Sequence, residues 1–361
     1  MDLEKIRAET PGIKNVIHLN NCGAGLMPQP VLDAVVTHLR REAEIGGYEA
    51  AREADAAIEN SYDAIAALLN CRREEIAVVE NATVAWDMAF YGLPMGQGDV
   101  VLTAVSEYAS NYIAYLQRAK RDGIDVRIIP NDKYGRTDPA ALASMIDDKR
   151  VKLISITHLP TNGGLINPAA EIGKIARDAG IPYLLDACQS AGQLPLDVRA
   201  IGCDMLSATG RKYLRGPRGT GFLYVRNDFL ERLKPPMLDL HGAQWTEGGR
   251  YTLRKDARRF ENWEFNIAGQ IGLGVAVEYA NALGQDAIHG RIVKLADMLR
   301  KSLSSVIGIT VHDIGHEKGG IVSFSTSTMD PETLKLRLRE QKINCWTSRT
   351  SSTRIDMTRR G

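Results

Sequence analysis

Seven short, β-rich apolar runs alternate with helical stretches in the middle of the chain, and this alternation constrains the fold more than any other feature. The runs are nearly continuous in apolar residues, as strands buried on both faces should be. Alternating strands and helices over ~150 residues predict an α/β protein with a mainly parallel, doubly wound sheet. The predicted strands are 76–79, 99–105, 125–130, 152–158, 182–186, 204–209 and 219–225.

Cap residues followed by proline mark where helices should begin. Asn167-Pro168 predicts the start of a helix that Gly180 ends, and Asp138-Pro139 predicts another start, because proline fits the first helical turn and glycine the end. Residues 260–305 are expected to be helical. Later, residues 320–327 predict a strand, and Asp330-Pro331 predicts the start of the helix that follows it.

These elements suggest a division of the chain into three parts. We predict an N-terminal segment over 1–20, a large domain over 21–270 and a smaller α+β domain over 271–361. The chain stops at Arg359-Arg360-Gly361, and we expect no closing strand or helix before that point. The smaller domain would then lack pairing partners. We therefore expect the natural protein to continue.

Composition excludes several classes of protein. The 361 residues carry 45 Lys+Arg against 44 Asp+Glu, so neither a basic nucleic-acid arm nor an acidic tail is expected. No apolar run approaches the ~20 residues of a membrane helix, and the N-terminus lacks the pattern of a secretory signal. The five cysteines are odd in number, and no CxxC occurs. We expect neither a metal site nor disulfides, and a cytoplasmic protein.

Chemistry-bearing residues concentrate in 186–225. Asp186 ends an apolar run, and ligands of open α/β sheets bind at the carboxyl ends of strands. Lys212 lies in a loop rich in glycine, beside Thr209 and Arg211, which suit a phosphate. Taken alone, Asp186 could equally be a helix cap, and a lone lysine is usually a surface charge.

Together, these residues fit one cofactor. Pyridoxal 5′-phosphate needs a lysine for its Schiff base, a carboxylate to keep its ring nitrogen protonated and a phosphate cradle. The protonated ring is the electron sink that makes a carbanion at the substrate Cα accessible. The order of residues is neither that of a P-loop nor G-x-G-x-x-G.

The sequences DACQSAGQLPLDV and SATGRKYLRGPRGTGFLYV resemble those of class V (fold-type I) pyridoxal-phosphate enzymes. This group includes cysteine desulfurases, isopenicillin N epimerase-like proteins and the C–S lyases of ergothioneine biosynthesis. The resemblance extends over most of the chain, from 18–35 to 343–357. It implies that Lys212 forms the Schiff base and that Asp186 pairs with the ring nitrogen. Gln189 would bind the phenolic oxygen or the imine.

The resemblance also assigns residues around the cofactor. ENATVAW (80–86) corresponds to a turn that opens a helix, where the Ala82 backbone and Thr83 would bind phosphate. SEYASN (106–111) places Tyr108 over the cofactor ring, where desulfurases have histidine. THLPTNGG (157–164) carries the contact to the phenolic oxygen, with Asn162 as the expected donor and Thr161 as its substitute. Thr209 and Arg211 complete the phosphate site.

Three further residues are expected to face the substrate. Asn21 lies in the matching N-terminal segment. Tyr48 follows Gly46-Gly47, a break that either lets a ligand approach or simply joins two helices. In the family, the segment matching 260–266 reaches the neighbouring subunit's phosphate through a threonine, where this chain has Glu264; Trp263 or Glu264 would face substrate instead. The resemblance implies a homodimer with shared active sites.

The reaction is the open question. Desulfurases use a mobile cysteine whose thiolate attacks the substrate sulfur, but the matching position falls near Ser351 or Ser352, and Cys345 lies too early. We therefore expect a C–S β-lyase that cleaves an S-substituted cysteine or its sulfoxide to pyruvate and ammonia. An aminotransferase or an epimerase of the isopenicillin N type is the alternative, and a desulfurase or a catalytically inactive relative is less expected. The resemblance places the family's carboxylate-binding arginine beyond the point where this chain ends, and neither Arg349 nor Arg354 aligns with it. Either that arginine is missing from this sequence or another arginine serves.

Overall fold

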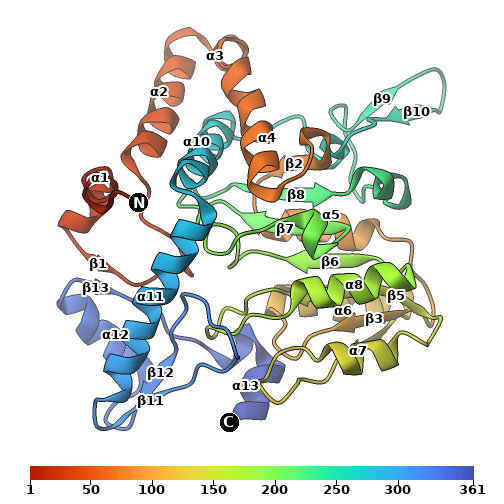
Figure 1. The fold of residues 1–361 in the computed structure, drawn as a ribbon. Helices are drawn as coiled ribbons and strands as arrows, with labels where there is room; N and C mark the ends of the chain where they lie inside the picture. Colours follow the sequence, from red (N-terminus) through yellow and green to blue (C-terminus); the bar gives the residue numbers. More distant parts are fainter.

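The computed structural model describes residues 1–361, and a seven-stranded sheet forms its centre (Figure 1). Its order is β2-β8-β7-β6-β5-β3-β4. Every predicted strand is present, and each end lies within two residues of its predicted position. The strands are β2 (Ile76–Val79), β3 (Val100–Thr103), β4 (Asp125–Ile128), β5 (Val151–Thr157), β6 (Tyr183–Asp186), β7 (Met205–Thr209) and β8 (Gly221–Val225).

Strand β8 is the one antiparallel member of the sheet, since it runs against both β7 and β2 while all other pairs are parallel. The connection from β7 to β8 covers only residues 210–220. A parallel return needs a crossover of a dozen or more residues, usually a helix. The short loop that contains Lys212 therefore forces β8 to turn back, and the prediction of a mainly parallel sheet is confirmed.

Helices cover both faces of the sheet (Figure 1). One face packs against α4, α8, α9 and α10, and the other against α5 and α6. The helices are α1 (Leu3–Ala8), α2 (Gln29–Ile45), α3 (Gly47–Glu53), α4 (Asp55–Leu69), α5 (Ala82–Gly92), α6 (Ala109–Asp122), α7 (Pro139–Met145), α8 (Ala169–Ala179), α9 (Val198–Ile201), α10 (Ile267–Leu283), α11 (Gln285–Ser304), α12 (Pro331–Glu340) and α13 (Arg354–Arg360).

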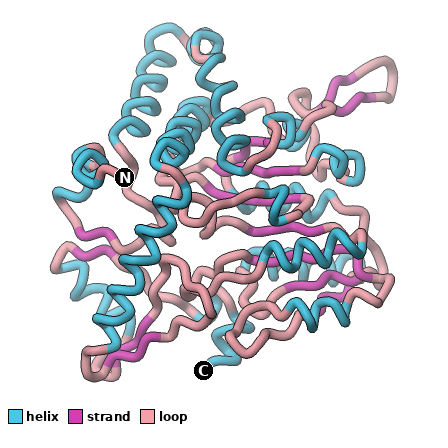
Figure 2. Tube along the Cα trace, in the orientation of Figure 1, coloured by secondary structure: helices cyan, strands magenta, loops and turns pink.

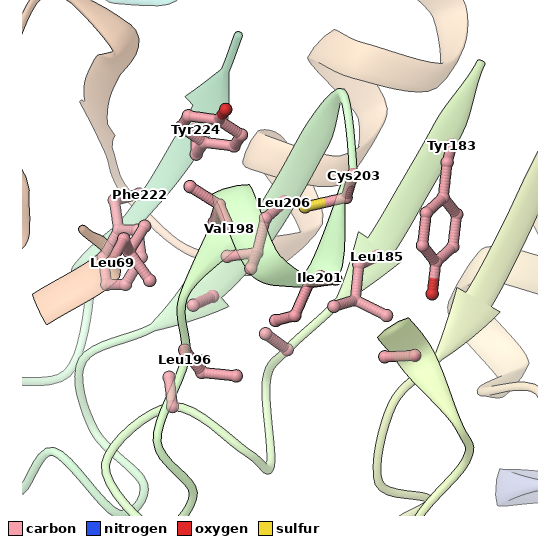
Figure 3. Packing of buried hydrophobic residues seen from close by; sticks show 14 of the residues in the cluster. Leu69, Tyr183, Leu185, Leu196, Val198, Ile201, Cys203, Leu206, Phe222 and Tyr224 are labelled. Carbon is pink, nitrogen blue, oxygen red and sulfur yellow. The ribbon is translucent and has the colours of Figure 1, made fainter. Parts of the chain in front are cut away.

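Side chains of the central strands alternate between the two hydrophobic cores, as the period of a strand requires. Leu185 and Leu206 point to the face covered by α8 and α9, where they meet Val198 and Ile201 (Figure 3). Leu184 belongs to the core on the side of α5 and α6. The continuous apolar runs of the sequence thus reflect strands buried on both sides.

The two helix starts differ in how they form. Asp138 caps α7 as predicted, because its carboxylate accepts a hydrogen bond from the Ala140 N–H. The predicted cap at Asn167 is wrong: α8 begins at Ala169, and no side chain caps it. Asn167 instead accepts from the Thr137 N–H at 2.9 Å and donates to the Thr157 carbonyl at 2.7 Å. Its amide therefore joins three segments of the chain.

The C-terminal region is a smaller unit beside the sheet (Figure 2). Strands β11 (Ile309–Val311) and β12 (Phe324–Thr326) pair antiparallel, and Asp330 caps α12. β1 (Ile17–His18) pairs in parallel with β13 (Ile343–Asn344), which ties the N-terminal segment to this region. The division at residue 270 stays a prediction, and that residue lies inside α10.

A hairpin of β9 (Ala243–Trp245) and β10 (Tyr251–Leu253) projects from the side of the molecule (Figure 1). The helical prediction for 260–305 holds from Ile267 onward, where α10 begins. None of the helices combines the length and apolar character that a membrane span requires.

Two glycines in helices should respond oppositely to alanine. A Cβ on Gly173 of α8 would lie 1.8 Å from the Ile201 carbonyl oxygen of α9, so Gly173→Ala should lower the free energy of unfolding by about 1–3 kcal/mol through overpacking. A Cβ on Gly290 of α11 would meet no atom within 4 Å, so Gly290→Ala should raise it by about 0.5–1 kcal/mol. Urea unfolding of both variants checks this; equal effects would contradict the packing of α8 on α9.

Candidate active site

Three neighbouring strands end at the same edge of the sheet and place polar side chains there. Thr157 ends β5, Asp186 ends β6 and Thr209 ends β7. Thr157 is paired with Asp186, and Asp186 with Ser207, in the strand register. Because the carboxyl ends of parallel strands meet at one edge, this edge is where an α/β sheet binds ligands.

Lys212 lies three residues after β7, in the turn that leads to β8. Its side chain is buried, yet its amine has neither an acidic partner nor a hydrogen bond. The N-terminal loop 20–25 covers the turn: the Gly25 N–H donates to the Arg211 carbonyl at 2.8 Å. A Cβ on Gly25 would lie 2.6 Å from the Lys212 carbonyl oxygen, so only glycine allows this close approach. Asn21 lies in the same loop.

Asp186 is buried at the tip of β6 and oriented by two donors. The Cys188 N–H donates to Oδ1 at 2.9 Å, and Asn111 Nδ2 donates to Oδ2 at 3.0 Å. No cation is paired with this carboxylate. Since each carboxylate oxygen can accept more than one hydrogen bond, Asp186 retains capacity for an N–H of a ligand.

Gln189 has one end of its amide satisfied and the other not. Nε2 donates to the Cys22 carbonyl and to Thr161 Oγ1, both at 3.1 Å. Its Oε1 is buried without a hydrogen-bond partner. Most buried polar atoms are paired, so an unpaired one beside other ligand-binding groups is a candidate contact for a ligand. The atom fits a ligand group beside Lys212.

The start of α5 provides a place for an anion. Asn81 caps the helix by accepting from the Val84 N–H at 3.0 Å, while the N–H groups of Ala82 and Thr83 have no acceptor. A Cβ on Gly221, the first residue of β8, would lie 2.9 Å from the Ala82 nitrogen. The free amides therefore lie against the β7–β8 loop, where a helix N-terminus favours a phosphate.

Three predicted cofactor contacts have side chains bonded elsewhere. An Arg211 guanidinium N–H donates to the Gly23 carbonyl. Asn162 Nδ2 donates to Asp356 Oδ2 of α13 at 2.6 Å, so Thr161, bonded to Gln189, is the residue of this segment nearest the site. Thr209 Oγ1 donates to the Thr220 carbonyl at 3.2 Å, and its lone pairs remain able to accept.

Tyr108 immediately precedes α6, with its N–H donating to Glu107 Oε1 at 2.8 Å. The side chain is exposed while its backbone is fixed. A ring in this position can cover a flat ligand at the strand ends. Tyr108 therefore stays a candidate for the stacking role.

The structure does not bring Tyr48 to the site of its own chain. α2 has 17 residues, a length of about 25 Å, and α3 with Tyr48 lies at its far end (Figure 1). Gly46, with φ of 101°, forms the turn between the two helices. Trp263 is also exposed, but the neighbouring Asn262 donates to Glu80 at 3.3 Å, close to the start of α5.

Sequence reasoning missed two residues of the hydrogen-bond network around the strand-end carboxylate. Asn111 donates to both Asp186 and Glu107, and Glu107 is itself buried. Burial raises the pKa of Glu107 to about 7, and the nearby Asp186 adds to the rise. Both lie in SEYASN, where only Tyr108 drew an assignment. A charged residue shortly after an apolar run, Glu107, was the available signal.

Comparisons with known proteins agree with this geometry. The family model for aminotransferase class-V matches residues 17–358. A probable cysteine desulfurase of Methanothermobacter thermautotrophicus is 32% identical, covering 96% of this chain and 86% of that protein. A probable hercynylcysteine sulfoxide lyase of Mycobacterium tuberculosis is 29% identical, covering 94% and 82%.

A solved complex of a cystine C–S lyase with its product cysteine persulfide is 26% identical, with a TM-score of 0.87, covering 94% of this chain and 92% of that one. The fold-type I prediction is thereby confirmed. A buried amine without a partner, a strand-end carboxylate, an orphaned amide oxygen and free helix amides also fit pyridoxal 5′-phosphate, the cofactor of this family. The chain belongs to the aminotransferase class V family of pyridoxal-phosphate enzymes.

Proposed function

We propose that this enzyme is a C–S β-lyase that acts on an S-substituted cysteine or a cysteine sulfoxide. The observation that carries the proposal is the absence of an activated thiol. A desulfurase needs a cysteine thiolate to attack the substrate sulfur. The segment 345–353, where the family's cysteine is expected, offers serine and threonine beyond Cys345.

Each cysteine of the chain resists ionisation. Burial raises the pKa of Cys345, and Lys335 offsets this only in part. Burial likewise raises the pKa of Cys22, although Lys212 and Arg211 lie near it. The remaining three follow the same pattern, with the pKa of Cys71 raised to about 12 and those of Cys188 and Cys203 raised well above the ordinary value. None is a thiolate near neutral pH.

The bound coenzyme supplies the sink that stabilises negative charge on the substrate Cα. Lys212 Nζ would hold it and could also act as the general base that removes the Cα proton. Asp186, oriented by Asn111 and Cys188, would accept the ring N–H. Gln189 Oε1, buried and free, would accept from a polar group next to Lys212. The amides of Ala82 and Thr83 would bind the phosphate.

The overall reaction requires no protein nucleophile. The Cβ–S bond breaks with its electron pair going to sulfur, and one water is consumed as the remaining enamine hydrolyses. A cysteine sulfoxide thus yields a sulfenic acid, pyruvate and ammonium. An oxidised sulfur is a better leaving group than a thiolate, so a general base and an electron sink suffice.

Cysteine desulfurase is the second candidate, because a relative at 32% identity carries that name. The two reactions differ in the fate of sulfur: a desulfurase transfers it to an enzyme cysteine, whereas a β-lyase releases it with its substituent. Transfer of the amino group to a keto acid, or inversion at Cα, would instead identify an aminotransferase or an epimerase.

The proposal includes a homodimer with shared active sites. Two large aromatic side chains of the projecting hairpin are exposed, Trp245 (81%) and Tyr251 (61%), and Trp263 (49%) is exposed in the segment that follows. Exposed apolar patches on a soluble domain commonly mark interfaces. A partner bound there would lie beside Trp263. The neighbouring Asn262 donates to Glu80, the residue before the α5 cap Asn81.

Lys212 should be the single point of covalent attachment. Borohydride reduction of the yellow enzyme, followed by peptide mass mapping, should place the adduct on Lys212. Lys212→Ala should lower turnover by about 10²–10⁴-fold, because it removes the general base. The matched control is Lys174→Ala, whose amine pairs with Asp178 on the surface of α8. An adduct on another lysine would overturn the assignment.

Substitution of Cys345 separates the two reactions. For a β-lyase, Cys345→Ser should leave pyruvate release from S-substituted cysteines and their sulfoxides within about twofold of the wild type, as expected for a surface change. Cys71→Ser, away from the site, is the control. Sulfide release and protein persulfide from free cysteine are measured in parallel. Persulfide formed at a rate matching turnover, and lost in Cys345→Ser, would establish a desulfurase.

A further inference from the structure

A second buried carboxylate lies behind Asp186, and the proposed mechanism does not use it. Glu107 lies between β3 and α6 and is 3% exposed. No cation is paired with it. Burying an unpaired carboxylate costs several kcal/mol unless hydrogen bonds compensate. Hydrogen bonds from the surrounding residues must therefore stabilise the Glu107 carboxylate.

Five donors surround the Glu107 carboxylate. Oε1 accepts from the Tyr108 N–H at 2.8 Å, from Asn111 Nδ2 at 2.9 Å and from the Thr157 hydroxyl. Oε2 accepts from the Thr103 hydroxyl at 2.8 Å and from the Tyr115 hydroxyl at 3.5 Å. The donors come from β3, β5 and α6. A shell that can donate this many hydrogen bonds stabilises a negative charge on Glu107.

Asn111 connects this carboxylate to Asp186. Its Nδ2 lies 2.9 Å from Glu107 Oε1 and 3.0 Å from Asp186 Oδ2. Two carboxylate oxygens on one amide atom fix that atom as the nitrogen, because an amide oxygen there would face two acceptors. Each of its two hydrogens serves one carboxylate, so the positions of Glu107 and Asp186 are coupled through a single side chain.

The pKa of Glu107 lies close to neutral pH. Burial raises its pKa to about 7 and the charge of Asp186 raises it further, while the hydrogen bonds from Thr157, Asn111 and Thr103 oppose the rise. Asp186 is the charged group that faces it, and Tyr115 is the other titratable one. A cation bound against Asp186 would favour the ionised form of Glu107. The reverse also holds, because coupling between two sites is reciprocal.

We propose that Glu107 and Asn111 form a positioning unit that orients Asp186 and raises the proton affinity of the ring nitrogen that Asp186 binds. The inference rests on the role proposed for Asp186. Glu107 would add a second negative charge near the protonated ring nitrogen. Asn111 and the Cys188 N–H together fix the orientation of the Asp186 carboxylate. The strength of the electron sink would then depend on two carboxylates rather than one.

The test uses enzyme reconstituted with pyridoxal 5′-phosphate labelled with ¹⁵N in its ring. The ¹⁵N chemical shift reports ring protonation directly and without turnover. Glu107→Gln should lower the proton affinity of the ring nitrogen about tenfold, seen as deprotonation about one pH unit lower. Asn111→Ala should shift it in the same direction and weaken coenzyme binding about tenfold, measured by equilibrium dialysis.

The matched control is Glu75→Gln. Glu75 is equally buried but accepts from the Arg72 and Asn227 N–H groups, away from the site. The Glu75→Gln variant should leave the ¹⁵N titration of the ring nitrogen unchanged. Circular dichroism and thermal unfolding establish that each variant folds. If Glu107→Gln fails to fold, Asn111→Ala decides, since it retains Glu107.

Asp186→Asn distinguishes failure of this inference from failure of the proposed function. If Asp186→Asn abolishes ring protonation while Glu107→Gln and Asn111→Ala both titrate like Glu75→Gln, the positioning unit is refuted and the role of Asp186 stands. If Asp186→Asn also titrates like the wild type, the assignment of Asp186 itself is wrong.

Discussion

The hydrogen-bonded register of β5, β6 and β7 is the constraint on which the site depends. It sets Thr157 beside Asp186 and Asp186 beside Ser207, and two strand residues later the chain enters the turn of Lys212. Successive residues of a strand point to opposite faces, so a slip by one residue would turn Asp186 toward α8 and α9. In the observed register, Asp186 shares the face of Leu184, the face that α6 covers and from which Asn111 reaches it.

Buried polar and charged side chains in this molecule differ in whether the fold satisfies their hydrogen bonds. Arg300 is buried, but its guanidinium donates to Asp313 and to the carbonyls of Gly319 and Ile321, so its hydrogen-bonding capacity is used by the fold. Lys212 is buried without a partner, and Gln189 keeps one amide oxygen unsatisfied. An unpaired buried polar group destabilises the native state. Lys212 and Gln189 both lie at the strand-end edge of the sheet, where a ligand could bond to the free amine and the free amide oxygen.

The sequence predicted those features that depend on local pattern. Continuous apolar runs predicted the seven strands, since strands buried on both faces need no polar alternation. Asp186 and Lys212 could be identified because one ends a strand and the other lies in a glycine-rich turn. Contacts between distant segments could not be predicted in this way. Asn162 is bonded to Asp356, 194 residues away, and nothing in THLPTNGG indicates that its amide faces α13. Asn167 matched a capping pattern, but a partner in another segment took its side chain.

The cover of the site is held from three directions, which bears on how a substrate reaches Lys212. The loop 20–25 accepts hydrogen bonds from Arg211 at Gly23 and from Gln189 at Cys22. His18 Nε2 and the Ala24 carbonyl are 2.8 Å apart, and the same strand, β1, pairs with β13 of the C-terminal region. The loop is therefore fixed to the lysine turn, to the Asp186 strand end and to the smaller unit at once. The β1–β13 pairing thus connects the cover to the smaller unit, alongside direct bonds between the two parts such as Asn162 to Asp356 and the Gly319 N–H to the Gly164 carbonyl.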